Sequence, residues 1–386
     1  MTTPRRPVWP ASVSRPVVSP IQPAVVYASD GPDMLDDQYE GRAPGYTYAR
    51  EGHPNADALA GMIDAMEGAK GGIVTGSGMA AVTAGLLGVL RAGDHVLGGD
   101  QLYGRSLRLI NETLPALGIE ASTTDPTDVA AVEAALRPNT RVVLIEVVSN
   151  PTIRVADVAG IAALCRDRGV LLAIDNTFTT PRSFRPFDHG ADIVIHSVTK
   201  LLAGHSDATL GYVATRDPDL RSQINVLAVT MGLTASPFDC WLAERGLLTF
   251  TMRYDRAEAN AAALADALAA HPGVRRVLYP QRPDHPDHKR ARGLLGDRGS
   301  HMLSFEIAGG RAEANTLIAA LPSIPFAPTL GDISTTISHA ATSSHRALSE
   351  AERSTIGISE GFFRVSVGCE EPEDLRTWFL AGLDQL

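Results

Sequence analysis

Lysine is rare in this chain, and one lysine directly follows an apolar segment. Of the 34 basic residues only Lys70, Lys200 and Lys289 are lysines. Lys200 follows the hydroxyl residues Ser197 and Thr199 at the end of the apolar segment DIVIH. A lysine in a partly dry crevice loses proton affinity and becomes a nucleophile near neutral pH. A surface lysine is the alternative, and it suits Lys70, beside two glycines, and Lys289, in HPDHKRAR, better than Lys200.

An acidic residue and a glycine-rich turn also follow apolar segments. Asp175 ends VLLAID, where it could cap the next helix or face a ligand as a fixed negative charge. The segment GSGM at 76–79 precedes an expected helix, whose free backbone N–H groups and dipole favour an anion such as phosphate. A plain tight turn is one alternative reading. A dinucleotide fingerprint is another, because GSGMAA has the Gly-x-Gly-x-x-Ala form and Asp94 or Asp100 follows at a suitable distance.

Together these groups favour pyridoxal 5'-phosphate as a cofactor. An amine can hold its aldehyde, a carboxylate can keep its pyridine nitrogen protonated, and N–H groups and hydroxyls can bind its phosphate. Nicotinamide binding would explain the glycines and leave Asp175 and Lys200 without a role.

The elements that must position these residues alternate between strand and helix patterns from about 55 to 215. Asn55 can cap a helix in which Leu59, Ile63 and Met66 share one face. This alternation, with strands rich in Val, Ile and Leu, predicts an α/β fold with a mostly parallel sheet covered by helices on both faces. The segments expected as strands are 71–76, HVLGG at 95–99, 141–147, 170–175 and 191–197, and those expected as helices begin at 78 and cover about 103–117 and 155–168.

The pattern changes after 215 and predicts a smaller α+β C-terminal domain. A long helical stretch at 241–271 precedes strand candidates RRVLYP, MLSFEI and FFRVSVG, and helices are expected near 311–320 and 371–385. We therefore expect an N-terminal arm at 1–54, a cofactor-binding domain at 55–250 and a C-terminal domain at 251–386.

Composition excludes several other classes of protein. A formal net charge of −10 predicts neither a nucleic-acid nor an anionic membrane partner. The longest near-apolar run, AAVTAGLLGVL at 80–90, is too short to span a bilayer. The proline-rich start has no apolar signal core, so we expect an extended arm there. Cys165, Cys240 and Cys369 form no ligand spacing, so we expect no disulfide framework and no metal site.

The sequence closely resembles the Cys/Met metabolism family, the pyridoxal-phosphate trans-sulfuration enzymes that include cystathionine γ-synthases, cystathionine γ-lyases and methionine γ-lyases. The resemblance runs from about 45 to 380 through YAREGHPN, EGAKGG, SGMAA, YGRS, SNPT, DNTFTTP, HSVTKLLAGHSD, RGLLTF and RVSVGCEEPEDL. It implies the aspartate-aminotransferase-like fold, known as fold type I, with a mostly parallel central sheet and a smaller C-terminal domain.

The resemblance also implies roles at the cofactor. Lys200 would hold the cofactor covalently and then shuttle protons, and Asp175 would face the pyridine nitrogen. Tyr103, otherwise a core tyrosine, would stack on the ring, with Asn150 near its phenolic oxygen. The phosphate would be held by the backbone of Gly78 and Met79, by the hydroxyls of Ser197 and Thr199, and by Tyr48 and Arg50 of the neighbouring subunit.

Further residues would bind the substrate, and three positions depart from the family pattern. Arg364 in RVSVG matches the clamp for the substrate carboxylate, beside Asn150. Ser334 and Thr335 lie where the family has a substrate loop, and many γ-specific members carry glutamate at the place of Ser334. The other two departures are His53, where asparagine is usual, and Arg105, where glycine or cysteine is common.

By this resemblance the chain is a cytoplasmic enzyme that removes or replaces a side-chain group of a sulfur amino acid. A cystathionine or methionine γ-lyase leads, because the chain is compact and GISEGFFRVSVGCEEPEDL resembles the γ-lyase ending. A cystathionine γ-synthase or O-acylhomoserine sulfhydrylase is the main alternative. A cystathionine β-lyase, an aminotransferase and a nicotinamide-dependent oxidoreductase remain further alternatives. Tyr48 and Arg50 imply at least a dimer, and the family usually forms homotetramers.

Overall fold

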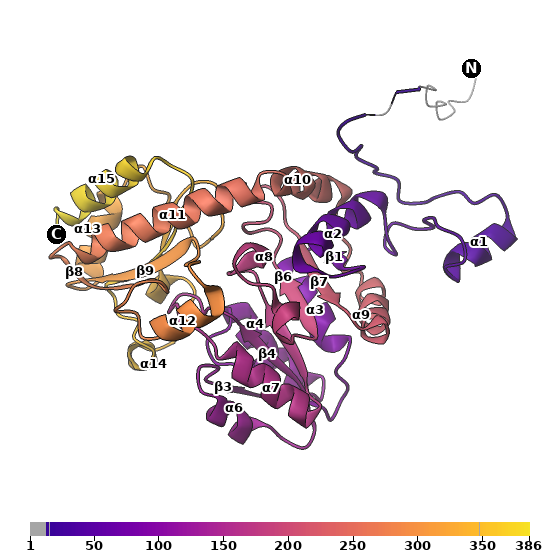
Figure 1. The fold of residues 1–386 in the computed structure, drawn as a ribbon, viewed down its shortest axis with the longest axis horizontal. Helices are drawn as coiled ribbons and strands as arrows, with labels where there is room; N and C mark the ends of the chain where they lie inside the picture. The colour runs from indigo at the N-terminus through magenta and orange to yellow at the C-terminus, as the bar shows by residue number, and fades with distance from the viewer. Residues whose placement is uncertain (1–12, 15, 347) are drawn as a thin grey trace.

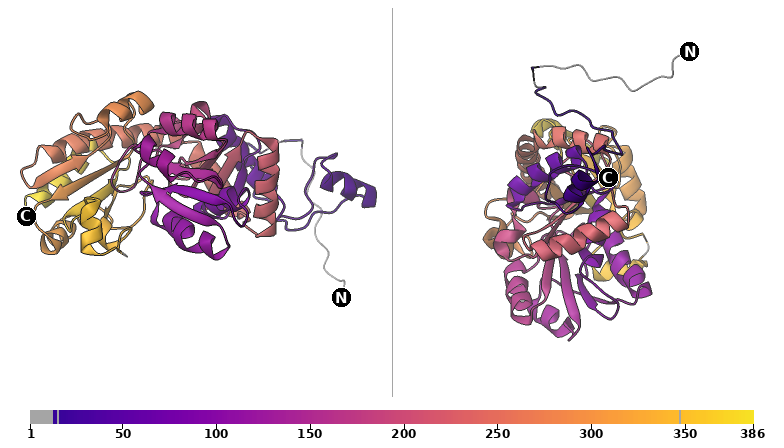
Figure 2. Two further views of the ribbon diagram at one scale, coloured as in Figure 1. Left: turned by 90° about the horizontal axis from the view of Figure 1, so that it is seen from below. Right: turned by 90° about the vertical axis from the view of Figure 1, so that its right-hand side faces the viewer.

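The chain forms two sheets, and the long helix α11 (Phe250–Ala269) leads from the part that contains the larger sheet and packs on the smaller sheet (Figure 1). The structure is a computed structural model that describes residues 13–14, 16–346 and 348–386. The first part of the predicted arm, residues 1–12 and 15, lies outside these residues. Helix α1 (Pro32–Tyr39) stands apart from the rest of the molecule in Figures 1 and 2, and none of its residues is buried.

The larger sheet has the strand order β1-β7-β6-β5-β4-β2-β3. The five strands from β6 to β3 are parallel, and only β7 runs against its neighbours. The mostly parallel sheet expected from the sequence is therefore confirmed. The strands are β1 (Ile73–Thr75), β2 (His95–Gly99), β3 (Glu120–Thr124), β4 (Thr140–Glu146), β5 (Leu171–Asp175), β6 (Ile193–His196) and β7 (Gly211–Thr215).

Helices cover both faces of this sheet, as the alternating pattern predicts. Val142 and Leu144 of β4 pack into the core under α3 and α9, whereas Val143 and Ile145 pack into the core under α2, α7 and α10. Successive strand residues point to opposite faces, so one strand contributes to both cores. The helices of this part are α2 (Pro54–Glu67), α3 (Gly78–Leu87), α4 (Gly104–Arg108), η1 (Leu109–Thr113), α5 (Leu114–Ala116), α6 (Val129–Ala135), α7 (Val158–Arg168), α8 (Thr180–Ser183), η2 (Pro186–His189), α9 (Pro218–Thr230) and α10 (Pro237–Leu247).

The smaller sheet is antiparallel, with the order β10-β11-β9-β8. Its core packs against α11, α13 and α15. Among the helices of the described residues, none combines the length and the apolar character needed to cross a membrane. The elements are α11 (Phe250–Ala269), β8 (Val274–Leu278), α12 (His288–Leu295), β9 (Met302–Ile307), α13 (Arg311–Ala319), β10 (Thr336–His339), η3 (Ala340–Thr342), α14 (Glu350–Thr355), β11 (Phe362–Ser366) and α15 (Pro372–Leu383).

Three expected elements differ from the structure. The helix expected to be capped by Asn55 begins at Pro54, and its N-cap is His53. Asn55 instead ties the arm to this helix, because its amide oxygen accepts the N–H of Gln22 at 2.9 Å and its amide nitrogen donates to the carbonyl oxygen of Pro20 at 3.0 Å. The helix expected at 103–117 runs without a gap over 104–116 and differs in its middle turn, because η1 is a π-helix. The helix expected at 241–271 is divided into α10 and α11 at residues 248–249.

Candidate active site

Charged side chains meet at one edge of the larger sheet. Glu146 and Asp175 are the last residues of β4 and β5, and Lys200 follows the end of β6. The three strands are adjacent and parallel, so their carboxyl ends lie side by side. Open α/β sheets bind ligands at this edge. The structure thus brings Asp175 and Lys200, both singled out in the sequence, to one end of the sheet.

The start of α3 forms a cradle beside Ser197. Ser77 is the N-cap of the helix, and its hydroxyl oxygen accepts the N–H of Ala80 at 3.1 Å. A Cβ on Gly78 would lie 2.6 Å from the Cβ of Ser197, so a larger residue would close this space. The first turn of a helix leaves N–H groups without helical acceptors, here including those of Gly78 and Met79. The cradle can therefore receive an anion.

The two hydroxyl residues before Lys200 are bonded differently. The backbone N–H of Ser197 donates to the hydroxyl oxygen of Thr177 at 2.7 Å, and its own side chain faces Gly78. The hydroxyl of Thr199 donates to the carbonyl oxygen of Leu210 at 3.1 Å and accepts the N–H of Leu210 at 2.9 Å. Ser197 can thus offer its hydroxyl to an anion directly, whereas Thr199 would first exchange a bond with Leu210.

The environment of Lys200 favours a neutral amine. Burial, and secondly the charge of Arg364, lowers the pKa of Lys200 below its usual range. A lysine with a lowered pKa is more often unprotonated and therefore more nucleophilic. A loop of the C-terminal part closes over its backbone, because Gly331, at φ +79°, leaves no room for a Cβ, which would lie 2.5 Å from the nitrogen of Leu201.

Asp175 and Glu146 form a pair of neighbouring carboxyl groups. They are register partners of β4 and β5. Burial raises the pKa of Asp175, while its bonds to Thr177 and the charge of His196 act in the opposite direction. Burial, and secondly the charge of Asp175, raises the pKa of Glu146 well above its usual range.

Tyr103 lies at the start of α4 with its side chain accessible. It is the N-cap residue of this helix, and 47% of its surface is exposed. Its backbone N–H donates to Oε1 of Glu146 at 2.7 Å. This bond fixes the backbone of Tyr103 beside the carboxyl end of β4 while its ring remains open to a planar ligand.

Arg364 is a buried cation from β11, in the smaller sheet. Its Nη1 donates to Oδ1 of Asn150 at 2.9 Å, and its Nη2 donates to the carbonyl oxygen of Thr329. Its Nε has no hydrogen-bond partner among the described residues, and burial lowers the pKa of Arg364 to about 10. A guanidinium in this state can bind a substrate carboxylate, which would supply the missing partner and charge.

The expected substrate loop contains one free and one engaged side chain. Ser334 is exposed, and its backbone N–H is bonded to Asp332 at 2.8 Å. Thr335 is buried, donates its hydroxyl to Oε2 of Glu370 at 2.7 Å and accepts the N–H of Gly368 at 2.8 Å. Ser334 can therefore face a ligand, whereas Thr335 holds the loop to the segment after β11.

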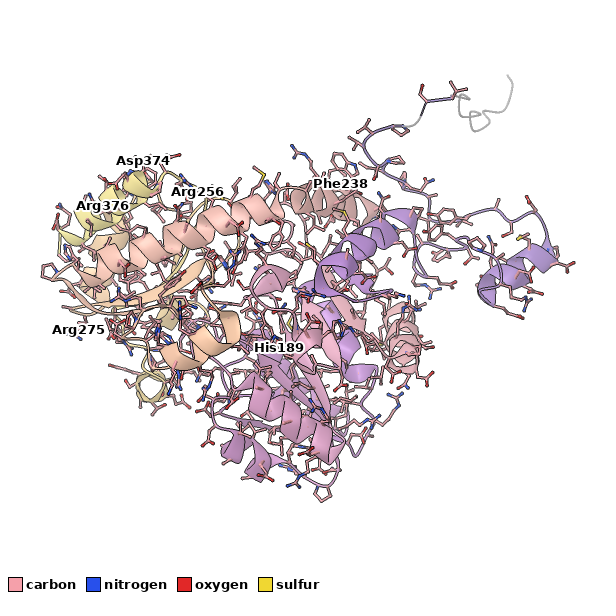
Figure 3. The ribbon with its side chains drawn as sticks, in the orientation of Figure 1. His189, Phe238, Arg256, Arg275, Asp374 and Arg376 are labelled. Atoms are coloured by element: carbon pink, nitrogen blue, oxygen red, sulfur yellow. The ribbon has the colours of Figure 1, made fainter. Side chains whose placement is uncertain are left out.

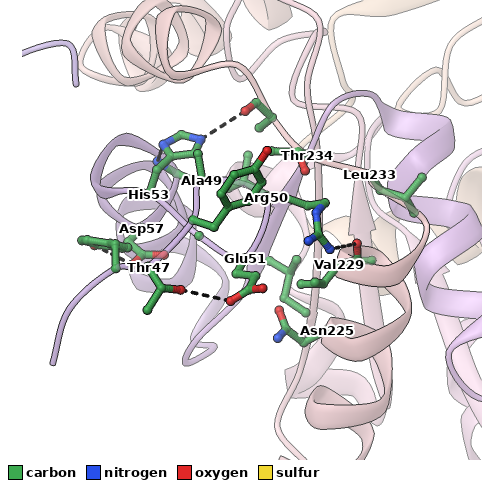
Figure 4. Close-up of a pocket in the computed structure, with 18 of the residues that line it drawn as sticks. Thr47, Ala49, Arg50, Glu51, His53, Asp57, Asn225, Val229, Leu233 and Thr234 are labelled. Atoms are coloured by element: carbon green, nitrogen blue, oxygen red, sulfur yellow. Dashed lines mark hydrogen bonds between the residues drawn. The ribbon is translucent and has the colours of Figure 1, made fainter. Parts of the chain in front are cut away.

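Tyr48 and Arg50 lie in a separate pocket of about 400 Å³ (Figure 4). The guanidinium of Arg50 is 5.4 Å from the centroid of the Tyr48 ring, and its Nη1 donates to the carbonyl oxygen of Val229 at 3.4 Å. The described residues that line this pocket do not include Lys200 or Asp175. The structure of one subunit thus does not bring this pair to the site at the sheet edge.

Sequence reasoning missed residues that support the site. Glu146 ends the apolar run RVVLIE just as Asp175 ends VLLAID, so the same signal could have found it. Arg253 donates to the carbonyl oxygens of Leu201 and Leu202, which directly follow Lys200. No local pattern indicates Arg253, because its partners are about fifty positions away in the sequence.

The residues fit pyridoxal phosphate. Gly78 preserves an open cradle beside Ser197 for the phosphate, and Lys200 offers an amine with a lowered pKa. Asp175 can face the ring nitrogen, and the unpaired Nε of Arg364 awaits an anionic group of the substrate.

Comparison with known proteins identifies the family. The profile of the Cys/Met metabolism PLP-dependent enzyme family matches residues 10–384. A cystathionine beta-lyase of Bacillus subtilis is 39% identical over 88% of this chain and 87% of its own length. An O-succinylhomoserine sulfhydrylase of Pseudomonas aeruginosa is 38% identical over 90% of this chain and 86% of its own length.

A solved structure extends the similarity to the fold and the cofactor. A putative O-acetylhomoserine (thiol)-lyase of Campylobacter jejuni superimposes with a TM-score of 0.92 at 27% identity, covering 97% of both chains. That structure contains N'-pyridoxyl-lysine-5'-monophosphate, a lysine joined to the cofactor. The chain has the type I fold of PLP-dependent enzymes and belongs to the Cys/Met metabolism family, whose members use pyridoxal phosphate in trans-sulfuration.

Proposed function

We propose that this enzyme cleaves the carbon–sulfur bond at the γ-carbon of a sulfur amino acid such as cystathionine or methionine. The observation that carries an amino-acid substrate is the buried Arg364, whose Nε has no partner among the described residues, beside the amine of Lys200. The likeness to a cystathionine beta-lyase supports carbon–sulfur cleavage, and the γ-lyase-like ending of the chain favours the γ-carbon. The likeness to a sulfhydrylase supports replacement at the same carbon as the second candidate.

Each site residue has a task in this reaction. Arg364 and Asn150 hold the α-carboxylate and so fix the position of Cα. Lys200 would take protons from Cα and then from Cβ, and would deliver a proton to the leaving sulfur. Asp175 would hold the proton at the pyridine nitrogen, and the side chain of Tyr103 would stack on the cofactor ring. Bound pyridoxal phosphate supplies an electron sink for the negative charge that develops at Cα.

The proposal includes an assembly of at least two subunits, with a homotetramer as the expected form. The described part of the arm exposes apolar side chains that a single subunit leaves uncovered. Tyr48 and Arg50 would reach the phosphate of the partner's site from this side. These exposed arm residues are Val13, Val17, Val18, Ile21, Val25 and Val26.

Three further assignments belong to the same proposal. Residues 1–54 would serve as the arm, 55–250 as the cofactor-binding domain and 251–386 as the C-terminal domain. The enzyme would act in the cytoplasm on small molecules, without nucleic-acid or membrane partners. Gly78, Met79, Ser197 and Thr199 would hold the phosphate.

A product assay tests the proposed reaction. The purified enzyme is incubated with cystathionine, methionine or cysteine, and separately with an O-acylhomoserine plus a thiol. Release of a four-carbon keto acid, ammonia and a thiol from cystathionine or methionine is expected for γ-elimination. A three-carbon keto acid from cystathionine would indicate β-elimination. A thioether formed only from O-acylhomoserine would indicate replacement, and a keto acid without ammonia would indicate an aminotransferase.

A further inference from the structure

Glu146 neighbours Asp175 and Tyr103, two residues that are proposed to contact the cofactor, but the proposed reaction gives Glu146 itself no task. It is the register partner of Asp175 across the adjacent parallel strands β4 and β5. Neighbouring strands are about 4.8 Å apart, so the two carboxyl groups start from adjacent backbone positions at the same sheet edge. On its other side, Oε1 of Glu146 accepts the backbone N–H of Tyr103 at 2.7 Å. Glu146 is thus the strand neighbour of the residue expected at the pyridine nitrogen and is bonded to the backbone of the residue expected to stack on the ring.

The surroundings of the two carboxyl groups are unequal. Asp175 accepts the N–H of Thr177 at 3.0 Å and is stabilised as an anion by the charge of His196. Glu146 accepts a single hydrogen bond among those of the described residues, and the charge that acts on its pKa is the negative one of Asp175. Two neighbouring half-buried carboxyl groups cannot both ionise without a large cost, so the less stabilised one retains its proton. The shifts agree, because Asp175 raises the pKa of Glu146.

We propose that Glu146 is a positioning residue that works in its protonated form, fixing Tyr103 through the backbone while leaving Asp175 as the only anion at the pyridine nitrogen. The inference rests on the proposed cofactor site and adds to it a neutral carboxylic acid. A second ionised carboxylate would add a negative charge beside the cofactor. That charge would favour the protonated forms of the groups around it. A neutral acid keeps the acceptor for Tyr103 without adding that charge.

Glu146→Gln is the deciding variant, because glutamine has the shape and charge of a protonated glutamate and keeps an oxygen acceptor. We expect its dissociation constant for pyridoxal phosphate, measured by titrating the apoprotein, to stay within about threefold of wild type. The pH at which the absorption band of the bound cofactor changes should also stay in place. Glu146→Ala removes the acceptor for Tyr103 and should weaken cofactor binding about tenfold, the effect of about 1.4 kcal/mol.

Two results would overturn the inference. If Glu146→Gln binds the cofactor as weakly as Glu146→Ala, or moves the spectral transition to lower pH by about one unit, the glutamate acts as an anion. If Glu146→Ala behaves as wild type in both measurements, Glu146 positions nothing. If Glu146→Ala does not fold, Glu146→Gln still decides between the protonated and ionised forms.

A matched control separates this role from a general loss of carboxylates. Glu133→Gln removes an exposed carboxylate of α6 that pairs with Arg168, and it should change neither measurement. Both measurements are made without substrate, so failure of the proposed carbon–sulfur cleavage would leave them unaffected. Only loss of the covalent lysine linkage itself would remove the basis of both proposals.

Discussion

Lys200 carries the most specific expectation for a single side chain. Lys200→Ala should remove turnover and the borohydride-reducible link to the cofactor, because arginine, the common cation of this chain, cannot replace an amine in that chemistry. Peptide mapping after reduction measures the linkage directly. Lys289→Ala, a lysine outside the site, is the control and should keep both properties. Cofactor trapped on the protein of the Lys200→Ala variant would show that another lysine serves.

A buried histidine near the site should make the fold sensitive to mild acid. His301 is fully buried beside Phe178 and Tyr254, and burial lowers its pKa to about 3. The unfolded chain therefore binds a proton between about pH 6.5 and pH 3 that the folded chain does not, so stability falls as the pH drops through this window. From pH 7.5 to pH 5 His301 should account for about 2 kcal/mol of lost unfolding free energy.

Denaturant unfolding at the two pH values measures this effect. A folded His301→Gln variant has no proton to bind at this position and should lose correspondingly less stability on acidification. His189→Gln, at an exposed histidine labelled in Figure 3, is the control and should lose as much as wild type. An equal loss in all three proteins would mean that other groups control the acid response.

The sequence could predict the reactive residues of the site better than their supports. Asp175 and Lys200 follow apolar runs, and the edge of a parallel sheet brings such positions together whatever their separation in sequence. The hydrogen bond that engages the Thr335 hydroxyl could not be predicted, because its partner Glu370 lies 35 positions away in the sequence and is brought close by the fold of the smaller sheet. The hydrogen bonding of the substrate-loop side chains therefore becomes known only from the structure.

The start of α2 offers a test at the level of an element. His53 accepts the N–H of Ala56 at Nδ1, 3.2 Å away, and its Nε2 lies 3.1 Å from the carbonyl oxygen of Ala235. His53→Ala should destabilise the protein by about 1–2 kcal/mol, because the helix loses its cap and the second contact is lost. His53→Asn, the residue usual in the family, should keep the cap and lose less. Thermal and denaturant unfolding measure the difference, and equal stability of all three proteins would contradict this role.

Helix existence was easier to predict than helix continuity. The apolar periodicity of 241–271 carries no sign of the break between α10 and α11. The last turn of α10 packs tightly just before this break, since a Cβ on Gly246 would lie 2.1 Å from the carbonyl oxygen of Ala203. Strand β3, with the sequence EASTT, was missed because its polar residues give no strand pattern, and its pairing with β2 decides its structure. Tertiary contacts settle such cases.

At the scale of the whole molecule, the position of the arm bears on how many subunits make one site. α1 and the described chain before it lie away from the larger sheet (Figures 1 and 2), and this part of the arm exposes apolar side chains. More apolar surface is exposed on α10, where Phe238 is labelled in Figure 3 and is 53% exposed. A subunit that leaves such surfaces open is suited to pairing with a second copy, which a single chain's sequence cannot place geometrically.

Mixing two inactive variants tests whether the sites are shared. If Arg50 serves the partner's site, a hybrid of Lys200→Ala and Arg50→Ala subunits contains one site with an intact Lys200 and an intact partner Arg50. Random exchange between equal amounts of the two variants makes half of the dimers hybrids, and one of the two sites in each hybrid is intact. Activity should therefore recover to about a quarter of wild type. A mixture of Lys200→Ala and Asp175→Ala is the control and should stay inactive, because each subunit then lacks a residue of its own site. If tagged subunits exchange and the first mixture also stays inactive, Arg50 and Lys200 belong to the same subunit's site, and the pocket around Tyr48 has another purpose.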